Sequence, residues 1–345
     1  MTELMEKILS RENMMQAYKK VKAKNGASGV DGIRTEEIRE YLIENWEEIR
    51  EKIKKRKYKP QPVLRVEIPK PNGGTRNLGI PSVVDRIIEQ AIAQVITPIV
   101  EPYFSEYSYG FRPKRSAQQA VLKLLEYLND GYLYVVDIDL EKFFDNVPQD
   151  KLMTLVGKII QDPDTESLIA KYLKAGVMIK GRYEETTKGT PQGGNLSPLL
   201  SNIMLNELDK ELEARNLHFV RYADDCVIVV KSSAAASRVM HTVTNWIERK
   251  LGLKVNASKT KVTKPSQLKY LGFGFVKMGD KWEARPHADS LAKFKRTLKK
   301  LTSRARGISM DERIQRLNWV IRGWINYFRI GKMKQNMQKI DKHLR

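Results

Sequence analysis

The alternation of apolar and polar positions is clearest around Asp224 and Asp225. Apolar, β-favouring residues lead up to this pair of carboxylates in residues 220–223 and away from it in residues 226–230. The alternation has a period of two on both sides and is broken only at Ala223-Asp224. This pattern predicts two short antiparallel strands joined by a tight turn.

A second apolar strand, residues 132–140, also ends in carboxylates. Asp137 and Asp139 lie two positions apart on it, so an alternating strand carries both side chains on one face. Strand alternation also occurs in residues 63–70 and 75–81, in the two arms of 177–187, and in residues 270–275. Turn-forming residues separate the first two of these segments, which predicts a hairpin, and Lys180-Gly181 turns the third.

Apolar residues recur at helical spacing in most of the remaining chain. Residues 1–60 predict short helices joined by a turn, and further helices are expected over 85–100, 117–128, 150–160, 165–173, 197–212 and 234–251. The strand-helix-strand order indicates a mixed sheet with helices on one face, which is an α+β unit.

The pattern changes near residue 285, after which three helical faces follow each other. The apolar positions are Leu291, Phe294, Leu298 and Leu301; Ile314, Leu317, Ile321, Trp324 and Phe328; and Met333, Met337, Ile340 and Leu344. They predict an all-α bundle of three helices, apolar inside and basic outside. The aromatic stripe of Trp319, Trp324, Tyr327 and Phe328 is expected in its core rather than stacked on bases.

The composition excludes several classes of protein. In 345 residues, no apolar run is long enough to span a bilayer and no signal-peptide pattern leads the sequence, so we expect a cytoplasmic protein without a membrane partner. Cys226 is the only cysteine, which excludes internal disulfides and thiolate zinc clusters. The four histidines are scattered without metal-ligand spacing.

The net charge of +21 favours a polyanionic partner, and its sign favours nucleic acid over a small acidic substrate. The excess is concentrated in residues 285–345, which hold 17 Lys and Arg against 4 Asp and Glu. A membrane-surface role for basic helices is disfavoured, because their apolar faces are committed to a core.

Adjacent aspartates at a turn repel each other, and a divalent cation removes that cost. An Asp-Asp pair alone is more often a solvated turn, but the second carboxylate strand favours a shared site. Three carboxylates from two strands can hold two Mg²⁺ ions for in-line nucleotidyl transfer. Lys70 and Arg76 on the predicted hairpin can face one anionic group, and residues 188–198, including Gln192, form either a ligand loop or a simple helix cap.

The sequence resembles the bacterial group II intron-encoded reverse transcriptases, or maturases, over nearly its whole length. The motifs stand in the family's order: Gly29-Val30-Asp31-Gly32, Ile68-Pro69-Lys70 with Arg76, Leu78-Gly79-Ile80-Pro81, Ser108-Tyr109-Gly110-Phe111-Arg112-Pro113, the Asp139 strand, Gly189-Thr190-Pro191-Gln192-Gly193, Tyr222-Ala223-Asp224-Asp225, Leu251-Gly252-Leu253 to Lys259-Thr260, and Leu271-Gly272-Phe273. Residues 317–328 are similar to the family's maturase (thumb) domain, which general polymerases lack.

The resemblance implies a right-hand polymerase: an N-terminal extension and fingers in residues 1–80, a palm with remaining fingers elements in 81–284, and a helical thumb in 285–345. It also implies roles for single residues. Asp139, Asp224 and Asp225 would be the catalytic metal triad, with Asp137 in support. Lys70, Arg76, Phe144 and Gln192 would bind the dNTP, and Phe144 would exclude a 2′-hydroxyl. Arg112, Tyr222, Lys259, Lys295, Arg296 and Lys299 are candidates for RNA or primer contacts.

The implied function is that of an RNA-directed DNA polymerase of a mobile group II intron. It would extend a DNA primer on an RNA template with dNTPs and two Mg²⁺ ions, or Mn²⁺ in their place, and would also bind intron RNA to assist splicing. The alternative is an RNA-binding splicing cofactor with secondary or vestigial polymerase activity. A relative serving defence or a CRISPR locus is disfavoured by the maturase-like segment. The family's C-terminal DNA-binding and endonuclease regions are missing from this sequence, so target-DNA cleavage is not expected.

Overall fold

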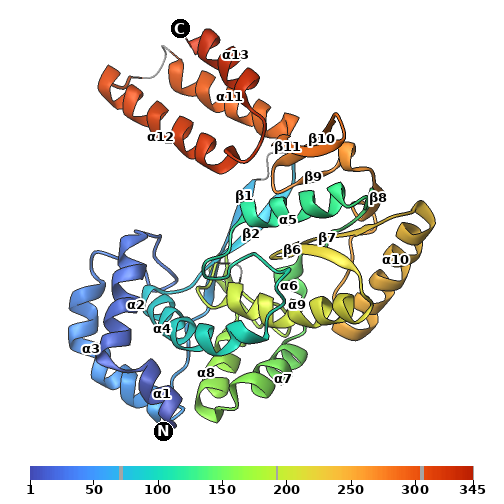
Figure 1. Cartoon of the computed structure of the whole chain (residues 1–345). Coiled ribbons are helices and arrows are strands. Elements are labelled where there is room, and N and C mark those ends of the chain that lie inside the picture. The colour runs from blue at the N-terminus through green and yellow to red at the C-terminus, as the bar shows by residue number, and fades with distance from the viewer. Residues whose placement is uncertain (70–72, 192, 304–306, 345) are drawn as a thin grey trace. The chain divides into compact units, whose positions relative to one another are not determined.

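The computed structural model describes residues 1–69, 73–191, 193–303 and 307–344 (Figure 1). The chain forms two compact units, each built from three separate segments. The first contains Met1–Glu106, Leu140–Glu211 and Thr244–Asn256, and the second contains Tyr107–Asp139, Leu212–Val243 and Ala257–Arg345.

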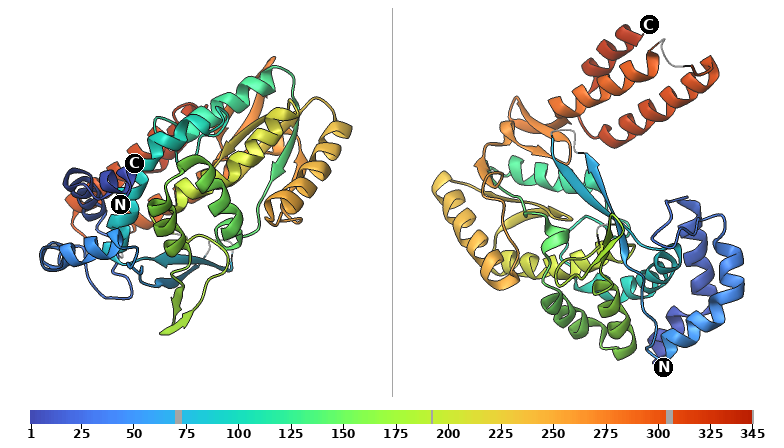
Figure 2. Two further views of the ribbon diagram at one scale, coloured as in Figure 1. Left: turned by 90° about the horizontal axis from the view of Figure 1, so that it is seen from below. Right: turned by 180° about the vertical axis from the view of Figure 1, so that it is seen from behind.

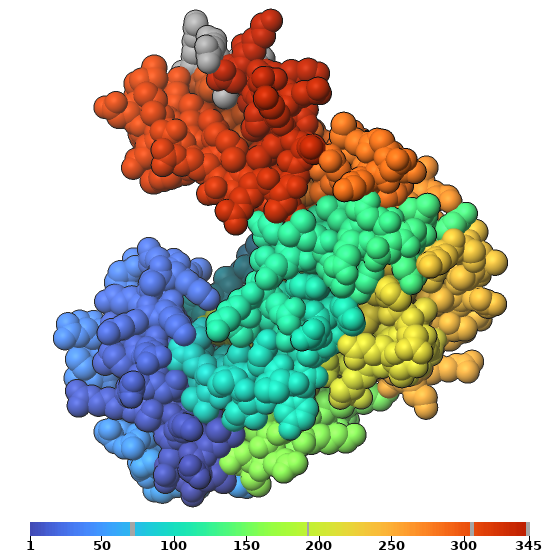
Figure 3. Space-filling model, viewed as in Figure 1, coloured from blue at the N-terminus to red at the C-terminus, as the bar shows by residue number. Residues whose placement is uncertain are grey.

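Helices dominate the start of the first unit. They are α1 (Glu3–Ile8), α2 (Arg11–Ala23), α3 (Ile38–Lys54) and α4 (Val83–Val100). The region of α1 to α3 forms the blue surface of Figure 3. On α4 the residues predicted from helical spacing, such as Ile88 and Ile92, are fully buried. Ser82 caps this helix, because its hydroxyl accepts the backbone N–H of Asp85 at 3.1 Å.

A four-stranded sheet in the same unit has the order β2-β1-β4-β5. The strands are β1 (Val63–Pro69), β2 (Thr75–Ile80), β4 (Val177–Ile179) and β5 (Arg182–Glu184). Both predicted hairpins are confirmed, since β1 pairs with β2 and β4 with β5 in antiparallel register, while β1 and β4 run parallel. The other elements of this unit are η1 (Glu101–Tyr103), α6 (Phe143–Asn146), α7 (Gln149–Ile160), α8 (Pro163–Leu173), most of α9 (Ser197–Ala214) and the π turn Ile247–Leu251.

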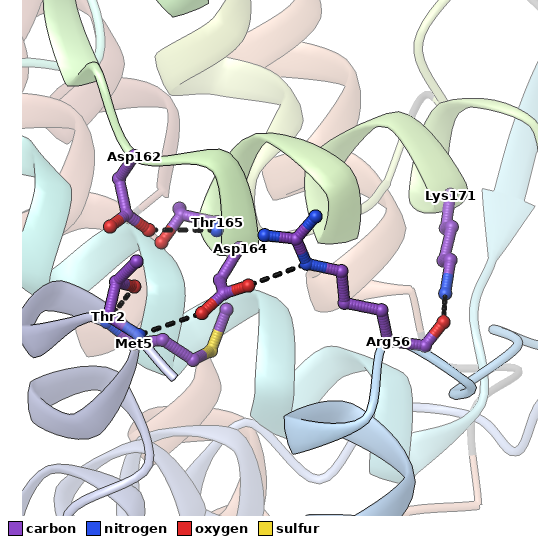
Figure 4. A network of polar contacts seen from close by, with 7 residues as sticks. All are labelled: Thr2, Met5, Arg56, Asp162, Asp164, Thr165 and Lys171. Carbon is purple, nitrogen blue, oxygen red and sulfur yellow. Dashed lines mark hydrogen bonds and ion pairs between the residues drawn. The ribbon is translucent and has the colours of Figure 1, made fainter.

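Asp164 at the start of α8 ties together three parts of this unit that are far apart in the sequence (Figure 4). It accepts the backbone N–H of Thr2 at 2.8 Å and forms an ion pair with Arg56 Nε at 2.6 Å. Lys171 donates to the carbonyl of Arg56 from the other end of α8. The backbone N–H of Thr165 is satisfied by Asp162, the N-cap residue, at 2.9 Å. The chain entering α1 and the chain leaving α3 are thereby attached to one helix.

The second unit contains an antiparallel sheet of order β6-β7-β3-β8. Its strands are β6 (His218–Tyr222), β7 (Asp225–Val230), β3 (Tyr134–Ile138) and β8 (Lys261–Thr263). Helix α5 (Ala117–Asn129) packs on it through Val121 and Leu124, which share a core with Val135, Val220 and Val227 of the strands. Helix α10 (Ser233–Trp246) follows β7.

A smaller three-stranded sheet, β11-β10-β9, corrects one prediction. Residues 270–275 were expected to form one strand, but β9 (Lys269–Tyr270) and β10 (Phe273–Met278) are separated by a turn. Leu271 and Gly272 at this turn both have positive φ, +49° and +80°, which an uninterrupted strand does not allow. The third strand, β11 (Lys281–Pro286), and the short η3 (Pro265–Gln267) were not predicted.

The predicted three-helix bundle is confirmed as α11 (Ala288–Thr302), α12 (Met310–Phe328) and α13 (Lys334–Leu344), which lie side by side in the right-hand view of Figure 2. Phe294 stacks on Trp324 with ring centres 4.5 Å apart and planes 11° from parallel. Phe328 instead packs on Phe273 of β10. The expectation for Trp319 was wrong, because its side chain is 65% exposed.

The α+β class followed by an all-α bundle is confirmed, but the single mixed sheet is replaced by three separate sheets. The division into 1–80, 81–284 and 285–345 follows chain order, whereas the two compact units are assembled from interleaved segments; that division stays a prediction. No helix in the described residues is both long and apolar enough to cross a membrane.

Candidate active site

The predicted carboxylates meet at one end of the β6-β7-β3-β8 sheet. Tyr222 pairs with Asp225 at the end of the β6-β7 hairpin, and Asp224 lies in the turn between them. On the other side of β7, Ile138 of β3 is opposite Cys226. The next pair in this antiparallel register sets Asp139 at the level of Asp225. Backbone pairing thus brings residues about 85 positions apart to one place.

Burial, together with mutual repulsion, raises the pKa of two of these carboxylates. The pKa of Asp225 is raised to about 6, first by the loss of solvent around the carboxylate and then by Asp224, Asp137 and Asp139. Loss of solvent also raises the pKa of Asp137, to which Asp139 adds. Lys259 opposes the effect on Asp225 and lies with its Nζ 3.6 Å from Asp139 Oδ2. A cation bound among these carboxylates would offset the desolvation and repulsion that raise the free energy of their ionised forms.

The residues fit a divalent cation by their chemistry. All of the donors are carboxylate oxygens, which Mg²⁺ and Mn²⁺ prefer, and a lysine ammonium already lies against Asp139. In the residues that the structure describes, no three Asp, Glu, His or Cys side chains lie close enough together to hold a metal as they stand. At Asp139 Oδ2 the positive charge is supplied by Lys259.

The β6-β7 hairpin is supported by Arg221, whose side chain is fully buried. Its Nη1 donates to the carbonyl of Ala223 at 2.9 Å, and Ala223 has a φ of +57°, a conformation that costs free energy in a residue with a Cβ. The hydrogen bond stabilises this turn conformation and with it the backbone that carries Asp224.

The segment Tyr107–Arg112 is docked on the same hairpin. The backbone N–H of Tyr109 donates to the carbonyl of Arg221 at 2.8 Å, and that of Arg221 donates to the carbonyl of Tyr107 at 2.9 Å. A Cβ on Gly110 would lie 2.2 Å from the backbone N of Ala223, so only glycine allows this approach. Arg112 is buried and donates to the carbonyl of Ser108 at 2.8 Å. Its place is inside the loop, which does not support the predicted RNA contact.

Phe144 and Arg76, two of the predicted nucleotide-binding residues, belong to the first unit. Phe144 is partly buried and contacts Phe143 edge to face, with ring centres 5.3 Å apart. Its carbonyl accepts the N–H of Thr190 at 2.7 Å, which docks the 188–191 segment beside it. Phe144 also lines a cavity of about 390 Å³ together with residues such as Arg65.

The remaining candidate residues differ in exposure, and two of them lie outside the described residues. Arg76 is exposed on β2, opposite Ile68 of β1, whereas Lys70 and Gln192 lie outside the described residues. Tyr222 is partly exposed at the end of β6. Lys295, Arg296 and Lys299 are all exposed on α11, away from its buried face.

Sequence reasoning missed several buried charged residues, and two of them, Arg221 and Glu89, support the segments described above. Glu89 accepts the backbone N–H of Asn195 at 2.6 Å and lies against Gly194, so it holds the end of the segment that leads into α9. Burial, and secondly Asp85, raises the pKa of Glu89 to about 8. The signal in the sequence was its position on the apolar face of α4, four residues before Ala93 and three before Ile92.

Two family models match the chain. The model described as reverse transcriptase (RNA-dependent DNA polymerase) matches residues 68–275, and the model described as group II intron, maturase-specific domain matches residues 291–345. The first begins at the end of β1 and includes β2 and the whole sheet that carries Asp139, Asp224 and Asp225. The second covers nearly all of the three-helix bundle.

Among curated relatives, Protein YkfC of Escherichia coli K12 is 32% identical over 289 residues, an alignment that covers 73% of this chain and 74% of YkfC. The group II intron-encoded protein LtrA of Lactococcus lactis subsp. cremoris is 31% identical over 338 residues, with 79% of this chain and 56% of LtrA covered. The chain therefore spans little more than half the length of LtrA.

A solved structure of telomerase from Candida albicans, in complex with a TWJ fragment of telomeric RNA, superposes with a TM-score of 0.51. The superposition covers 88% of this chain and 60% of the telomerase chain at 16% sequence identity. At this identity the likeness concerns the fold, and it agrees with the predicted right-hand polymerase architecture.

Proposed function

The chain belongs to the reverse transcriptase (RNA-dependent DNA polymerase) family and carries a group II intron maturase-specific domain, and on that premise we propose a specific role for it. It extends a DNA primer on an RNA template as the polymerase of a mobile group II intron. The observation that carries the proposal is the strand register that brings Asp139 to the level of Asp225, beside Asp224.

The protein's own groups divide the work of nucleotidyl transfer. Asp139, Asp224 and Asp225 would hold two divalent ions, which would supply the positive charge that acidifies the primer 3′-hydroxyl and offsets charge on the dNTP phosphates. Lys70 and Arg76 bind the triphosphate and neutralise the departing pyrophosphate. Phe144 excludes nucleotides with a 2′-hydroxyl by steric contact, and Gln192 contacts the incoming nucleotide.

Binding of RNA involves a different surface. The exposed cations Lys295, Arg296 and Lys299 lie on α11, in a segment with 17 Lys and Arg against 4 Asp and Glu. We assign to this bundle, as the thumb of a fingers, palm and thumb arrangement in residues 1–80, 81–284 and 285–345, the binding of the template duplex and of the intron RNA. Intron binding would assist splicing without carboxylate chemistry.

The rival function is an RNA-binding splicing cofactor in which polymerase activity is secondary or vestigial. The basic three-helix bundle is compatible with this cofactor function as well as with a polymerase. The two functions differ in their need for the carboxylates, because a splicing cofactor has no use for three aspartates that raise each other's free energy in the folded state.

Primer extension on a long RNA template with Mg²⁺ and dNTPs tests the proposal. Wild-type protein should give full-length cDNA and Asp224→Asn none, while both bind the template and both support intron splicing. Asp280→Asn, at an exposed turn between β10 and β11, is the matched control and should behave as wild type. Splicing without synthesis by the wild-type protein would place the cofactor role first.

A further inference from the structure

The loop docked on the carboxylate hairpin contains an aromatic residue that the proposed mechanism does not use. Phe111 follows Gly110, whose backbone touches that of Ala223, and precedes the buried Arg112. Its side chain is 49% exposed. Among the described residues the ring makes no stacking contact with another aromatic ring.

The backbone of Phe111 is strained as well. Its φ of +59° lies in the left-handed region, where a bulky side chain with a Cβ is rarely found. Strained residues persist where the surrounding structure determines their conformation, and they gather at functional sites. Here Gly110 and Arg112 are held on both sides, the first by close contact with the hairpin and the second by its hydrogen bond to Ser108.

The surroundings of the ring suit nucleic acid. Besides the buried Arg112, residues 107–116 contain two cations, Lys114 and Arg115, and no acidic residue. Lys114 is exposed and also has a positive φ of +60°. An exposed ring flanked by cations is the combination on which bases stack without sequence preference. An apolar ring held in water by a strained backbone gains free energy only when a ligand covers it.

We propose that the Phe111 ring is a stacking platform for the primer–template duplex, next to the carboxylate hairpin. This rests on the proposed polymerase function and adds a residue to it. The platform contacts a base or sugar close to the reacting end, because the contact between Gly110 and Ala223 places it one residue away from the hairpin turn. Its effect is on the position and affinity of the duplex, and it takes no part in proton transfer or metal binding.

The test uses a substitution that separates stability from binding. Phe111→Gly removes the ring and relieves the backbone strain, since glycine adopts positive φ freely. Phe111→Tyr keeps the ring. Gln161→Gly, at an exposed position after α7 with a φ of +50°, is the control for strain relief alone. Each variant is compared with wild type by thermal unfolding, by the Kd of an RNA–DNA primer–template duplex, and by kcat and KM in primer extension.

We expect Phe111→Gly to unfold at the same or a higher temperature than wild type, while its duplex Kd and KM rise about tenfold or more. Phe111→Tyr should bind as wild type does, and Gln161→Gly should gain stability without a change in Kd. An unchanged Kd in Phe111→Gly overturns the platform. Weaker duplex binding by Phe111→Gly also overturns it if this variant unfolds at a lower temperature than wild type and Phe111→Tyr shows the same lower unfolding temperature. A wild-type protein that extends no primer would instead overturn the polymerase function itself.

Discussion

Two carboxylates with raised pKa values, Asp225 and Glu89, show how the same physical effect has different uses in this protein. The pKa of each is raised mainly by the loss of solvent around the carboxylate. Asp225 is accompanied by three further aspartates at the end of a sheet, so a cation can offset its cost. Glu89 has Asp85 and Arg86 as charged neighbours, and it accepts the backbone N–H of Asn195. Glu89 therefore holds the segment before α9 by accepting this backbone N–H.

Replacing Glu89 by Gln should make stability less dependent on pH. The pKa of Glu89 is raised from its ordinary 4.5 to about 8, so between these values the folded protein keeps a proton that the unfolded chain has lost. Wild-type stability falls over this range, whereas Gln does not ionise and its amide oxygen still accepts from Asn195. We expect Glu89→Gln and wild type to unfold at similar temperatures at pH 4 and the variant to unfold several degrees higher at pH 8.

Thermal unfolding between pH 4 and pH 8.5 measures this difference. Glu44→Gln, on the exposed face of α3, is the control and should follow the wild-type curve throughout. Parallel curves for Glu89→Gln and wild type would show that Glu89 is ionised in the folded protein.

At Phe144 the expected effect is on nucleotide choice. Phe144→Val leaves room for a 2′-hydroxyl, so the preference for dNTP over rNTP should fall by about tenfold or more. Single-nucleotide incorporation kinetics with dCTP and CTP provide the measurement. Phe143→Leu is the matched control, since Phe143 is buried and its loss should lower stability while the preference stays. Equal preference in Phe144→Val and wild type would remove Phe144 from the nucleotide site.

At the scale of elements, function depends on how strands and loops meet. The β6-β7 turn carries Asp224, but its conformation is maintained by Arg221 beneath it and by the Tyr107–Arg112 segment beside it. Arg221 belongs to the preceding strand, three residues before Asp224. The other support is a loop more than a hundred residues earlier in the sequence. The candidate active site is thus an assembly of three elements.

Gly110→Ala tests this assembly. The added Cβ would meet the backbone N of Ala223 at 2.2 Å, and backbone cannot move aside as a flexible side chain can. The loop or the hairpin has to shift, and we expect primer extension to fall about a hundredfold with a lower unfolding temperature. In Gly323→Ala, on α12, the new Cβ meets nothing within 4 Å, so activity should persist and stability should rise slightly. Full activity in Gly110→Ala would mean that the docking is dispensable.

At the scale of the whole molecule, charge governs binding. With a net charge of +21, affinity for a template duplex should fall by roughly 10³ to 10⁵ between 50 and 200 mM salt if about six to ten phosphates are contacted. Most of the excess lies in residues 285–345, outside the sheet that carries the carboxylates. Affinity and chemistry should therefore respond to different substitutions.

The triple variant Lys295→Ala, Arg296→Ala, Lys299→Ala checks this separation. It should reduce the slope of log K against log salt by about two to three, because each lost phosphate contact removes 0.7 to 0.9. Fluorescence anisotropy with a labelled duplex gives the slope. The control triple Lys52→Ala, Lys54→Ala, Lys55→Ala removes lysines already paired with Glu48 and Glu51 on α3, so the slope should change little. Equal slopes for the first triple and wild type would contradict a phosphate contact at α11.

The sequence by itself determined the helices, most of the strands and the position of each carboxylate at a strand end. These features follow from periodicity and turn chemistry within a few residues, as in the alternation around Asp224 and the apolar face of α4. The motifs also sufficed to predict the reverse transcriptase family and its maturase domain, both of which the comparisons confirm.

Only the tertiary structure decided which of these residues meet. The β3-β7 register, the burial of Arg112, Arg221 and Glu89, and the exposure of Trp319 depend on contacts between segments far apart in the chain. Helical spacing predicted Trp319 in the core, because a local pattern contains no information on which elements pack together. Strand alternation predicted one strand in residues 270–275, because it contains no information on positive φ at Leu271 and Gly272. The strain at Phe111 belongs to the same class, since it arises where a loop is held against a distant hairpin.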